Sequence, residues 1–225
     1  MKTKTFFYNT NSIGTDEVGT GDYFGPIIVT ATYVKKEDIN FLKKLNVKDS
    51  KKIPDFKIKK IALKLLKYIP SKSIILKNKE YNSLNLNLNQ IKAILHNKVL
   101  IEITKTIKNY DYIIIDKFVK EKKYFKYLNG NKKIIKNVEF LVKAEEVHLS
   151  VACASIISRY FFIKEMEKLS NELKIALPYG ANYKTKKTAF KIINKYNLNK
   201  LLMCSKVNFK NTASIINDYY NHHKQ

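Results

Sequence analysis

The chain has 225 residues, of which 45% are hydrophobic, and this length and composition suit one large globular domain or two small ones. They exclude an intrinsically disordered chain, and no run approaches the roughly 18 apolar residues needed to span a bilayer. The formal net charge is +24, which favours a polyanionic partner such as nucleic acid. Arg159 is the only arginine, however, and lysine is enriched together with isoleucine and asparagine. Biased coding composition therefore explains the charge as readily as nucleic-acid binding does.

Two β-strands separated by a glycine-rich stretch are expected near the N-terminus. We expect the first over residues 5–14 and the second over 26–34, where PIIVTATYV is β-branched and aromatic. The intervening GTDEVGTGDYFGP, residues 14–26, holds four of the chain's six glycines. Because the two strands are so close in sequence, an antiparallel hairpin is favoured.

Helices and strands alternate through the middle of the chain. Isoleucine, leucine and valine recur every fourth residue from Ile91 to Ile107, which is a helical stripe. The short apolar run DYIIID favours a buried strand. We expect a polar loop at 47–53, a helix at about 55–68, a strand from Ser73, a helix at 87–108 and a strand at 111–116.

The last third of the chain is expected to be mainly helical. A strand is expected within residues 133–142, after a turn at Asn129-Gly130. A long helix should cover 150–173, with Ser150 as its cap, followed by breaks at Pro178 and Gly180. Further helices are expected near 186–196 and 210–220. Strands first and then alternating strands and helices predict a mixed α/β domain with helices covering a sheet.

Three acidic sites stand out by their position. The pair Asp16-Glu17 lies inside the glycine-rich stretch, Asp116 ends the isoleucine run, and Glu145-Glu146 separates a strand from a helix. Carboxylates at the ends of buried strands are costly unless something pairs with them. If they converge at one sheet edge, they suit a divalent cation. Turn, cap and first-turn roles remain the structural alternatives.

The predicted cation is Mg²⁺ or Mn²⁺, because the ligands are carboxylate oxygens and no His/Cys set offers a zinc site. Two such ions about 3.5–4 Å apart would support in-line displacement at phosphorus. One would generate the attacking hydroxide, and the other would stabilise the leaving 3′ oxygen.

Several segments of the chain resemble, in order, those of the type 2 ribonuclease H family, in particular ribonuclease HIII. The similarity begins with GTDEVGTGDYFGPIIVTATYV and extends over about residues 13–212. The other matching segments are DSKK at 49–52, LHNK at 95–98, YIIIDKF at 112–118, KAEEVHLSVACASIISRYFFIKEM at 143–166 and FKNT at 209–212.

The resemblance implies a ribonuclease H-like α/β fold, with a mixed β-sheet flanked by helices and a helical C-terminal region, in a single catalytic domain over residues 1–225. It also implies endonucleolytic cleavage of the RNA strand of RNA–DNA hybrids, leaving 5′-phosphate and 3′-hydroxyl ends. The family's four catalytic, metal-binding acids fall on Asp16, Glu17, Asp116 and Glu145, which makes Glu146 a bystander. Ideal strand geometry would point Asp16 and Glu17 to opposite faces. We therefore expect a backbone bend there, or Glu17 acting from the substrate side.

Two positions point to ribonuclease HIII rather than to its sister ribonuclease HII. The sister has aspartate where this chain has Glu145, and Gly-Arg-Gly where this chain has Gly19, Thr20 and Gly21. The resemblance assigns this tripeptide to substrate binding, where it can contact the 2′-hydroxyls that distinguish RNA from DNA. Four further residues are expected to contact phosphates, although each could equally be a solvated surface residue. These four residues are Lys51, Lys52, Lys210 and Asn211.

The chain departs from the family pattern in two respects. Family members usually carry an N-terminal domain of TATA-binding-protein type, whereas about a dozen residues precede the motif here. We therefore expect that domain to be missing, whether by nature or because this is a piece of a longer protein, and hybrid binding to be strongly salt-sensitive. In addition, LPYGAN at 177–182 replaces LPKGAG, which puts substrate contacts of that loop in doubt.

Two alternatives to hybrid cleavage stay open: ribonuclease HII-like incision at single embedded ribonucleotides, and hybrid binding without catalysis. Isolated cysteines at Cys153 and Cys204 suit a reducing compartment. The N-terminus shows no signal peptide. We expect a cytoplasmic monomer that makes no membrane contact.

Overall fold

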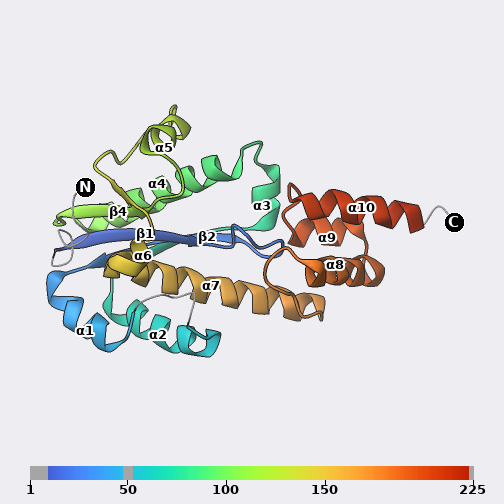
Figure 1. Ribbon diagram of the computed structural model, residues 1–225, viewed down its shortest axis with the longest axis horizontal. Coiled ribbons are helices and arrows are strands. Elements are labelled where there is room, and N and C mark those ends of the chain that lie inside the picture. Colours follow the sequence, from blue (N-terminus) through green and yellow to red (C-terminus); the bar gives the residue numbers. More distant parts are fainter. Residues whose placement is uncertain (1–9, 48–52, 223–225) are drawn as a thin grey trace. The chain divides into compact units, whose positions relative to one another are not determined.

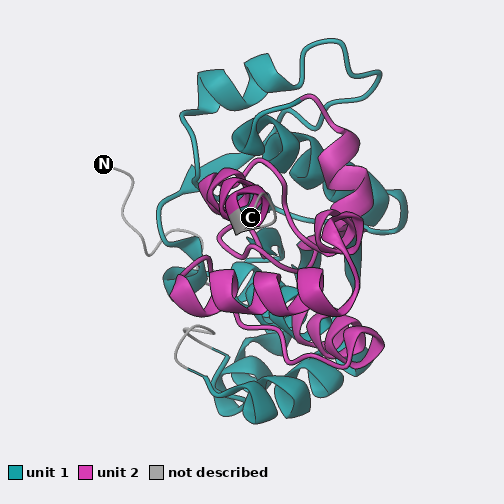
Figure 2. Cartoon of the chain, turned by 90° about the vertical axis from the view of Figure 1, so that its right-hand side faces the viewer, with its two compact units in different colours: residues 1–18, 28–74, 86–161 teal, residues 19–27, 75–85, 162–225 magenta. Residues whose placement is uncertain are grey.

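The computed structural model describes residues 10–47 and 53–222. They fall into two compact units, coloured separately in Figure 2. Unit 1 contains Met1–Val18, Ile28–Ile74 and Leu86–Phe161, and unit 2 contains Gly19–Ile27, Ile75–Asn85 and Phe162–Gln225.

A five-stranded mixed sheet forms the centre of unit 1, with strand order β3-β2-β1-β4-β5. β1 pairs antiparallel with β2 and parallel with β4, and β4 pairs parallel with β5. The mixed sheet predicted from the sequence is therefore confirmed. The strands are β1 (Ser12–Val18), β2 (Ile27–Val34), β3 (Ser71–Leu76), β4 (Tyr112–Asp116) and β5 (Glu139–Leu141).

Helices cover both faces of this sheet, with α4 on one side and the first half of α7 on the other (Figure 1). Coverage on both faces explains why every residue of β2 is buried. The remaining helices of unit 1 are short, apart from α2. The helices are η1 (Lys36–Asp38), α1 (Ile39–Lys44), α2 (Asp55–Tyr68), α4 (Leu88–Thr106), α5 (Glu121–Tyr127), α6 (Ala144–Val147) and α7 (Leu149–Leu173).

The helix α4 has the apolar stripe that its sequence predicts. Ile91, Leu95 and Val99 are buried, as is Ile103 one turn further on. The helix begins after Asn87, whose side chain accepts a hydrogen bond from the backbone N–H of Gln90 at 3.0 Å. Lys92 and His96 are also buried on α4, which the hydrophobic stripe alone does not account for.

The close approach of β1 to the start of α7 requires glycine at position 14. A Cβ built on Gly14 would overlap the backbone of Ser150 and Val151. The hydroxyl of Ser150 also bonds that of Ser12 at 3.0 Å. Contact between strand and helix backbones fixes the depth at which α7 lies against β1.

We expect Gly14→Ala to lower the free energy of unfolding by about 2–4 kcal/mol, because backbone atoms of α7 must move to admit the methyl group. Urea unfolding measures the change. Gly21→Ala is the matched control, since no heavy atom lies within 4 Å of a Cβ at Gly21 and its φ is not positive. An unchanged midpoint for Gly14→Ala would contradict this close packing.

Unit 2 is helical over most of its length, as the sequence predicts for the C-terminal region. It contains the second half of α7 together with α3 (Asn78–Ser83), α8 (Tyr183–Lys195), α9 (Leu198–Cys204) and α10 (Lys210–His222). α8 packs on both α9 and α10. Among the described residues, no helix has the length and apolar character required to cross a membrane.

Three expectations from the sequence need correction. The first strand starts at Ser12 and ends at Val18, so Asp16-Glu17 lies in the strand rather than in the loop; residues 5–9 are outside the described part. The strand within 133–142 is only Glu139–Leu141. Ser150 lies inside α7, where its hydroxyl bonds Ser12 instead of capping the helix.

The other expected elements are confirmed with small shifts in their ends, except the polar loop at 47–53, of which residues 48–52 lie outside the described residues. The strand expected from Ser73 ends at Leu76, and the residues that follow form α3 instead of continuing it. α8 starts three residues earlier than expected because the Asn182 side chain caps it, accepting from Lys184 N at 3.0 Å and Thr185 N at 3.4 Å. The sequence did not predict five short helices: α1, α3, α5, α6 and α9.

Candidate active site

Asp16 and Asp116 come from neighbouring parallel strands of unit 1. The register pairs Thr15 of β1 with Ile115 of β4, and both aspartates occupy the next position. The carboxyl ends of parallel strands meet at one edge of a sheet, where ligands commonly bind in α/β proteins. The sequence therefore brings two carboxylates from 100 residues apart to one edge.

The Asp16 side chain is buried beneath α7, with only 8% of the residue exposed. Its Oδ1 accepts the backbone N–H of Glu17 at 2.8 Å, and Ser155 hydrogen-bonds the carboxylate. Burial raises the pKa of Asp16 well above its usual value, and the negative charges of Glu17 and Asp116 add to the increase. The hydrogen bonds from Ser155 and Glu17 offset only part of this effect.

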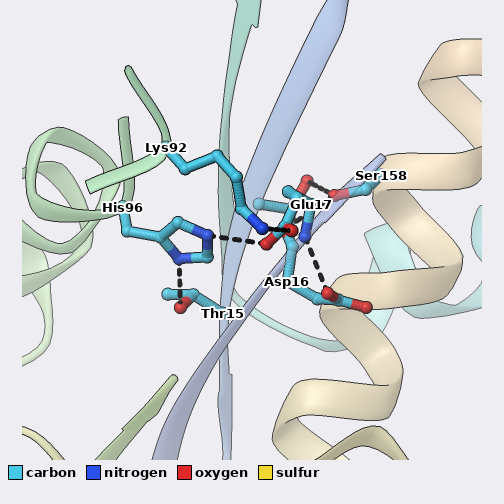
Figure 3. A network of polar contacts seen from close by, with 7 residues as sticks. Thr15, Asp16, Glu17, Lys92, His96 and Ser158 are labelled. Carbon is cyan, nitrogen blue, oxygen red and sulfur yellow. Dashed lines mark hydrogen bonds and ion pairs between the residues drawn. The ribbon is translucent and has the colours of Figure 1, made fainter. Parts of the chain in front are cut away.

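Glu17 points to the other face of the sheet, towards α4 (Figure 3). It forms an ion pair with Lys92, and its Oε2 lies 2.9 Å from His96 Nε2. Burial works to raise the pKa of Glu17, but the hydrogen bonds and charges of His96 and Lys92 outweigh it and lower that pKa to about 2. Glu17 is therefore a stable carboxylate, whereas its neighbour Asp16 resists ionisation.

The partners of Glu17 are themselves held in place. The Nδ1 of His96 lies 2.8 Å from the Thr15 hydroxyl, and the His96 ring stacks on Phe118 with centroids 5.3 Å apart. Lys92 Nζ lies 4.1 Å from the centroid of the same Phe118 ring, a cation–π contact. Thr15, Phe118 and the two α4 residues thus form a preorganised cradle for Glu17.

The predicted backbone bend at Asp16-Glu17 is wrong. The β1–β2 ladder continues without interruption through Asp16↔Thr30, Glu17↔Val29 and Val18↔Ile28. Regular alternation therefore sends the two carboxylates to opposite faces of the strand. The Ser158 hydroxyl supports this geometry by donating to the carbonyl of Asp16 at 3.2 Å.

Glu145 lies at the start of α6, which the Asp116 carboxylate anchors. Asp116 Oδ1 accepts the backbone N–H of Ala144 at 2.8 Å. Lys143 takes a left-handed conformation with φ 54°, which redirects the chain from β5 into the helix. Glu145 is 6% exposed, whereas Glu146 is half-exposed and pairs with Lys143 at 3.1 Å.

We expect Glu145→Gln to lower kcat for the hybrid cleavage that the resemblance implies by at least about 100-fold, since a buried carboxylate beside the Asp116 anchor would lose its charge. Glu146→Gln is the matched control and should leave kcat within about twofold, because Glu146 faces solvent. Steady-state kinetics on a labelled hybrid measures both. Equal losses for the two variants would contradict the assignment.

The residues expected to bind substrate fall in different parts of the chain. Gly19, Thr20 and Gly21 follow β1 directly and begin unit 2. Gly19 has φ 87°, and its carbonyl accepts the N–H of Asp22 at 3.4 Å, so the tripeptide forms a tight turn. Lys51 and Lys52 lie outside the described residues.

Lys210 and Asn211 line an open depression of about 400 Å³ in unit 2, together with Asn182, Tyr183 and Lys186. The Asn211 side chain donates to the carbonyl of Ala181 at 3.1 Å, which ties the start of α10 to the loop at 177–182. The structure thus joins the segment expected to contact phosphates to the loop whose substrate contacts the sequence left in doubt.

In that loop, asparagine at position 182 replaces the glycine typical of the family, and it caps α8. Tyr183 follows it and is 79% exposed. The replacement therefore has a structural role that the sequence alone did not reveal.

The donor set of unit 1 fits a hard divalent cation. Asp16 is buried, and its carboxylate is disfavoured by burial and by two neighbouring negative charges, a penalty that a bound cation would relieve. Within residues 10–47 and 53–222, no three His, Cys, Asp or Glu side chains converge closely enough to form a complete metal site.

Comparison with known proteins places this geometry in a family. The model of the ribonuclease HII family matches residues 13–212. The chain belongs to the ribonuclease HII family. It is 46% identical over 204 residues to a ribonuclease HIII of Phytoplasma mali, covering 89% of this chain and 71% of that protein. A ribonuclease HIII of Geobacillus sp. (strain WCH70) is 40% identical over 208 residues, covering 90% and 69%.

The fold agrees with this membership. The crystal structure of Bst-RNase HIII in complex with Mn²⁺ matches with a TM-score of 0.93 and 40% identity, covering 97% of this chain and 73% of that one. The ribonuclease H2 of Pyrococcus horikoshii shares the fold with a TM-score of 0.75 at 21% identity. The predicted ribonuclease H-like fold, a mixed sheet flanked by helices, is therefore confirmed.

Lys92 and His96, the two α4 residues that hold Glu17, were not predicted from the sequence. The signal was present, since the two residues are four positions apart on a helix and His96 belongs to the LHNK segment. Lys206 was not predicted for a different reason: one lysine in a chain with 43 Lys and Arg gives no sign that it is buried.

Proposed function

We propose that the chain is a ribonuclease HIII-type endonuclease that hydrolyses the RNA strand of RNA–DNA hybrids and leaves 5′-phosphate and 3′-hydroxyl ends. The observation that carries the proposal is the placement of buried Asp16 beside Asp116 at one edge of the sheet, with the pKa of Asp16 raised by burial and by neighbouring charge. Such a site favours a cation that brings a phosphodiester to it.

We propose Asp16, Asp116 and Glu145 as the ligands, because their oxygen donors suit Mg²⁺ or Mn²⁺. Glu17, the fourth acid expected from the sequence, points to the α4 face, where Lys92 and His96 hold it, and acts from that side. One relative's structure contains Mn²⁺. Two divalent ions, when bound, supply the activated water and the charge that stabilises the leaving 3′ oxygen. Asp16 and Asp116 supply negative charge at the strand ends, and Ser155 orients the Asp16 carboxylate.

The remaining protein groups keep this arrangement rigid. Lys92 and His96 hold Glu17 ionised and fixed in direction on the α4 face. The hydrogen bond from Ala144 N–H to Asp116 sets the start of α6 and therefore the position of Glu145. Preorganised charge of this kind costs no reorganisation during the reaction.

Two residues favour ribonuclease HIII over ribonuclease HII specificity. Glu145 stands where the sister enzyme ribonuclease HII has aspartate, and Thr20 stands where that enzyme has arginine. In this proposal the turn of Gly19, Thr20 and Gly21 contacts the RNA strand without an arginine to read an RNA–DNA junction. The 40–46% identity to proteins named ribonuclease HIII supports this choice.

We further propose that lysine charge contributes most of the hybrid affinity, with Lys210, Asn211 and the lysines at 51 and 52 contacting phosphates. The family model spans segments of both units, which supports their acting as one catalytic domain. The buried free thiols of Cys153 and Cys204 support a cytoplasmic location. A monomeric state remains a prediction.

Cleavage of three substrates tests the proposed function: a long RNA–DNA hybrid, a DNA duplex with one embedded ribonucleotide, and double-stranded RNA. With Mg²⁺ or Mn²⁺, we expect rapid cleavage of the hybrid alone. Binding of the hybrid without cleavage at any divalent-ion concentration would favour a non-catalytic binder. Efficient incision at the single ribonucleotide would favour ribonuclease HII activity.

A further inference from the structure

Lys206 is a lysine whose side chain is completely buried, in the segment between α9 and α10 of unit 2. Its Nζ donates to two main-chain carbonyls, those of Asp22 at 2.7 Å and Gly25 at 2.6 Å. Both acceptors belong to the glycine-rich loop that follows β1. Burying an ammonium group is costly, so a lysine kept at such a position needs an explanation.

The main chain around Lys206 is also joined to that loop. The Lys206 N–H donates to the carbonyl of Tyr23 at 2.9 Å, and Phe24 forms an antiparallel bridge with Ser205. The segment 204–206 therefore pairs with 23–25 as a short ladder. The Lys206 side chain adds hydrogen bonds to the carbonyls of Asp22 and Gly25, on either side of the Tyr23 carbonyl that its own N–H binds. Together, Lys206 binds three of the four carbonyls between Asp22 and Gly25.

These contacts end at the turn proposed to contact RNA. The N–H of Asp22 closes that turn by donating to the carbonyl of Gly19 at 3.4 Å. The Asp22 carboxylate accepts Gly180 N–H at 2.6 Å, and Tyr23 N–H donates to the Gly180 carbonyl at 3.0 Å. Asp22, which ends the turn, is thus held at its side chain by the Gly180 N–H and at its carbonyl by Lys206. Thr20 and Gly21, at the centre of the turn, have no comparable anchor in the contacts described.

We infer that Lys206 is a positioning residue that fixes the far end of the Gly19–Asp22 turn and so determines how tightly the enzyme binds the RNA strand. This inference rests on the proposed function, because it gives the turn its role. Lys206 acts on substrate binding through the loop and not on the chemical step. The Asp22 carbonyl shares a planar peptide group with the Tyr23 N–H, so the bond from Lys206 to this carbonyl also fixes the direction of the N–H that donates to Gly180.

The charge of Lys206 gives the inference a second observable. Burial lowers the pKa of Lys206 to about 7, and the Asp22 charge opposes only part of this decrease. The adjoining titratable groups are Asp22, Tyr23 and Cys204; burial raises the pKa of both Tyr23 and Cys204, so neither ionises near neutral pH. Above pH 7 the neutral amine keeps two donors but loses the strength of charge-assisted bonds.

Lys206→Met keeps the length and bulk of the side chain and removes the donor. Because the main-chain ladder remains, we expect this variant to fold, which circular dichroism checks. We expect KM for the hybrid to rise on the order of tenfold while kcat stays within about threefold. Lys191→Met, which removes an exposed lysine of α8, is the control and should leave both constants unchanged. An unchanged KM, or a loss confined to kcat, would overturn the inference.

Hydrogen exchange of wild-type protein tests the same inference without a variant and without activity. After correction for intrinsic rates, we expect residues 19–25 to exchange about fivefold faster at pH 8.5 than at pH 6, while β4 is unchanged. Equal protection at the two pH values would overturn the inference. If the protein failed to cleave hybrids but showed this loop response, the proposed function alone would be wrong.

Discussion

Asp16→Asn is expected to reduce kcat on an RNA–DNA hybrid by on the order of 10³-fold or more in Mg²⁺. The substitution keeps the shape of the side chain and its acceptor for the Glu17 N–H, but removes the negative charge at the end of β1. Hybrid affinity should stay nearly intact, because the residue carries no positive charge for the phosphates. Single-turnover cleavage and a filter-binding titration separate these two effects.

The same substitution should raise the stability of the metal-free protein at neutral pH, by roughly 1 kcal/mol or more. The raised pKa of Asp16 means that the folded state disfavours the ionised carboxylate, through burial and the charges of Glu17 and Asp116. The Asp16 carboxyl therefore contributes its full stabilisation of the wild type below pH 3.8, its pKa in the unfolded chain. This contribution is lost as the pH rises through the pKa of Asp16 in the folded state. Asparagine avoids that loss. A variant with wild-type turnover, or with lower stability in EDTA, would contradict this account.

Lys92→Met is expected to lower the free energy of unfolding by about 3 kcal/mol, because it leaves a buried Glu17 carboxylate without its ion-pair partner. The side chains of Lys92 and Glu17 are only 10% and 12% exposed. The pKa of Glu17 should rise from about 2, while the hydrogen bond and the charge of His96 continue to lower it. Urea unfolding in EDTA measures the loss.

The pH dependence of this loss has a defined sign. The lowered pKa of Glu17 stabilises the wild type fully above pH 4.5, and this contribution is lost as pH falls towards 2. The difference between wild type and Lys92→Met should therefore shrink across that range. Lys105→Met provides the contrast, since it breaks an exposed pair with Glu102 on the same helix and should cost less than about 0.5 kcal/mol.

A double-mutant cycle completes the test of the Lys92–Glu17 pair. Lys92→Met combined with Glu17→Gln removes both charges, so most of the lost stability should return. A cycle with no coupling would show that the pair contributes nothing to the site.

The elements that the sequence predicted well are those with a strong local pattern. The isoleucine run of β4, the β-branched β2 and the stripe of α4 are each buried as expected. The short helices were missed because they have too few turns to show a periodicity. α6 is an example: the left-handed Lys143 and the hydrogen bond to Asp116 define it, and both are tertiary features.

For the candidate site, the resemblance to the ribonuclease H family singled out four carboxylates, whose roles stay predictions, but it did not reveal their environments. Adjacent Asp16 and Glu17 have opposite pKa shifts because strand alternation sends one under α7 and the other against α4. No local pattern distinguishes Lys206 from the many exposed lysines. Its burial depends on which segments the fold brings beside it.

Mn²⁺ binding, followed by electron paramagnetic resonance, tests most directly the claim that the carboxylates of unit 1 hold the catalytic ions. Free Mn²⁺ is titrated with wild type, Asp16→Asn and Glu146→Gln, each with hybrid whose scissile position carries a 2′-deoxy sugar. The account predicts that wild type and Glu146→Gln take up Mn²⁺ equally and that Asp16→Asn takes up far less. Equal uptake by Asp16→Asn would contradict it.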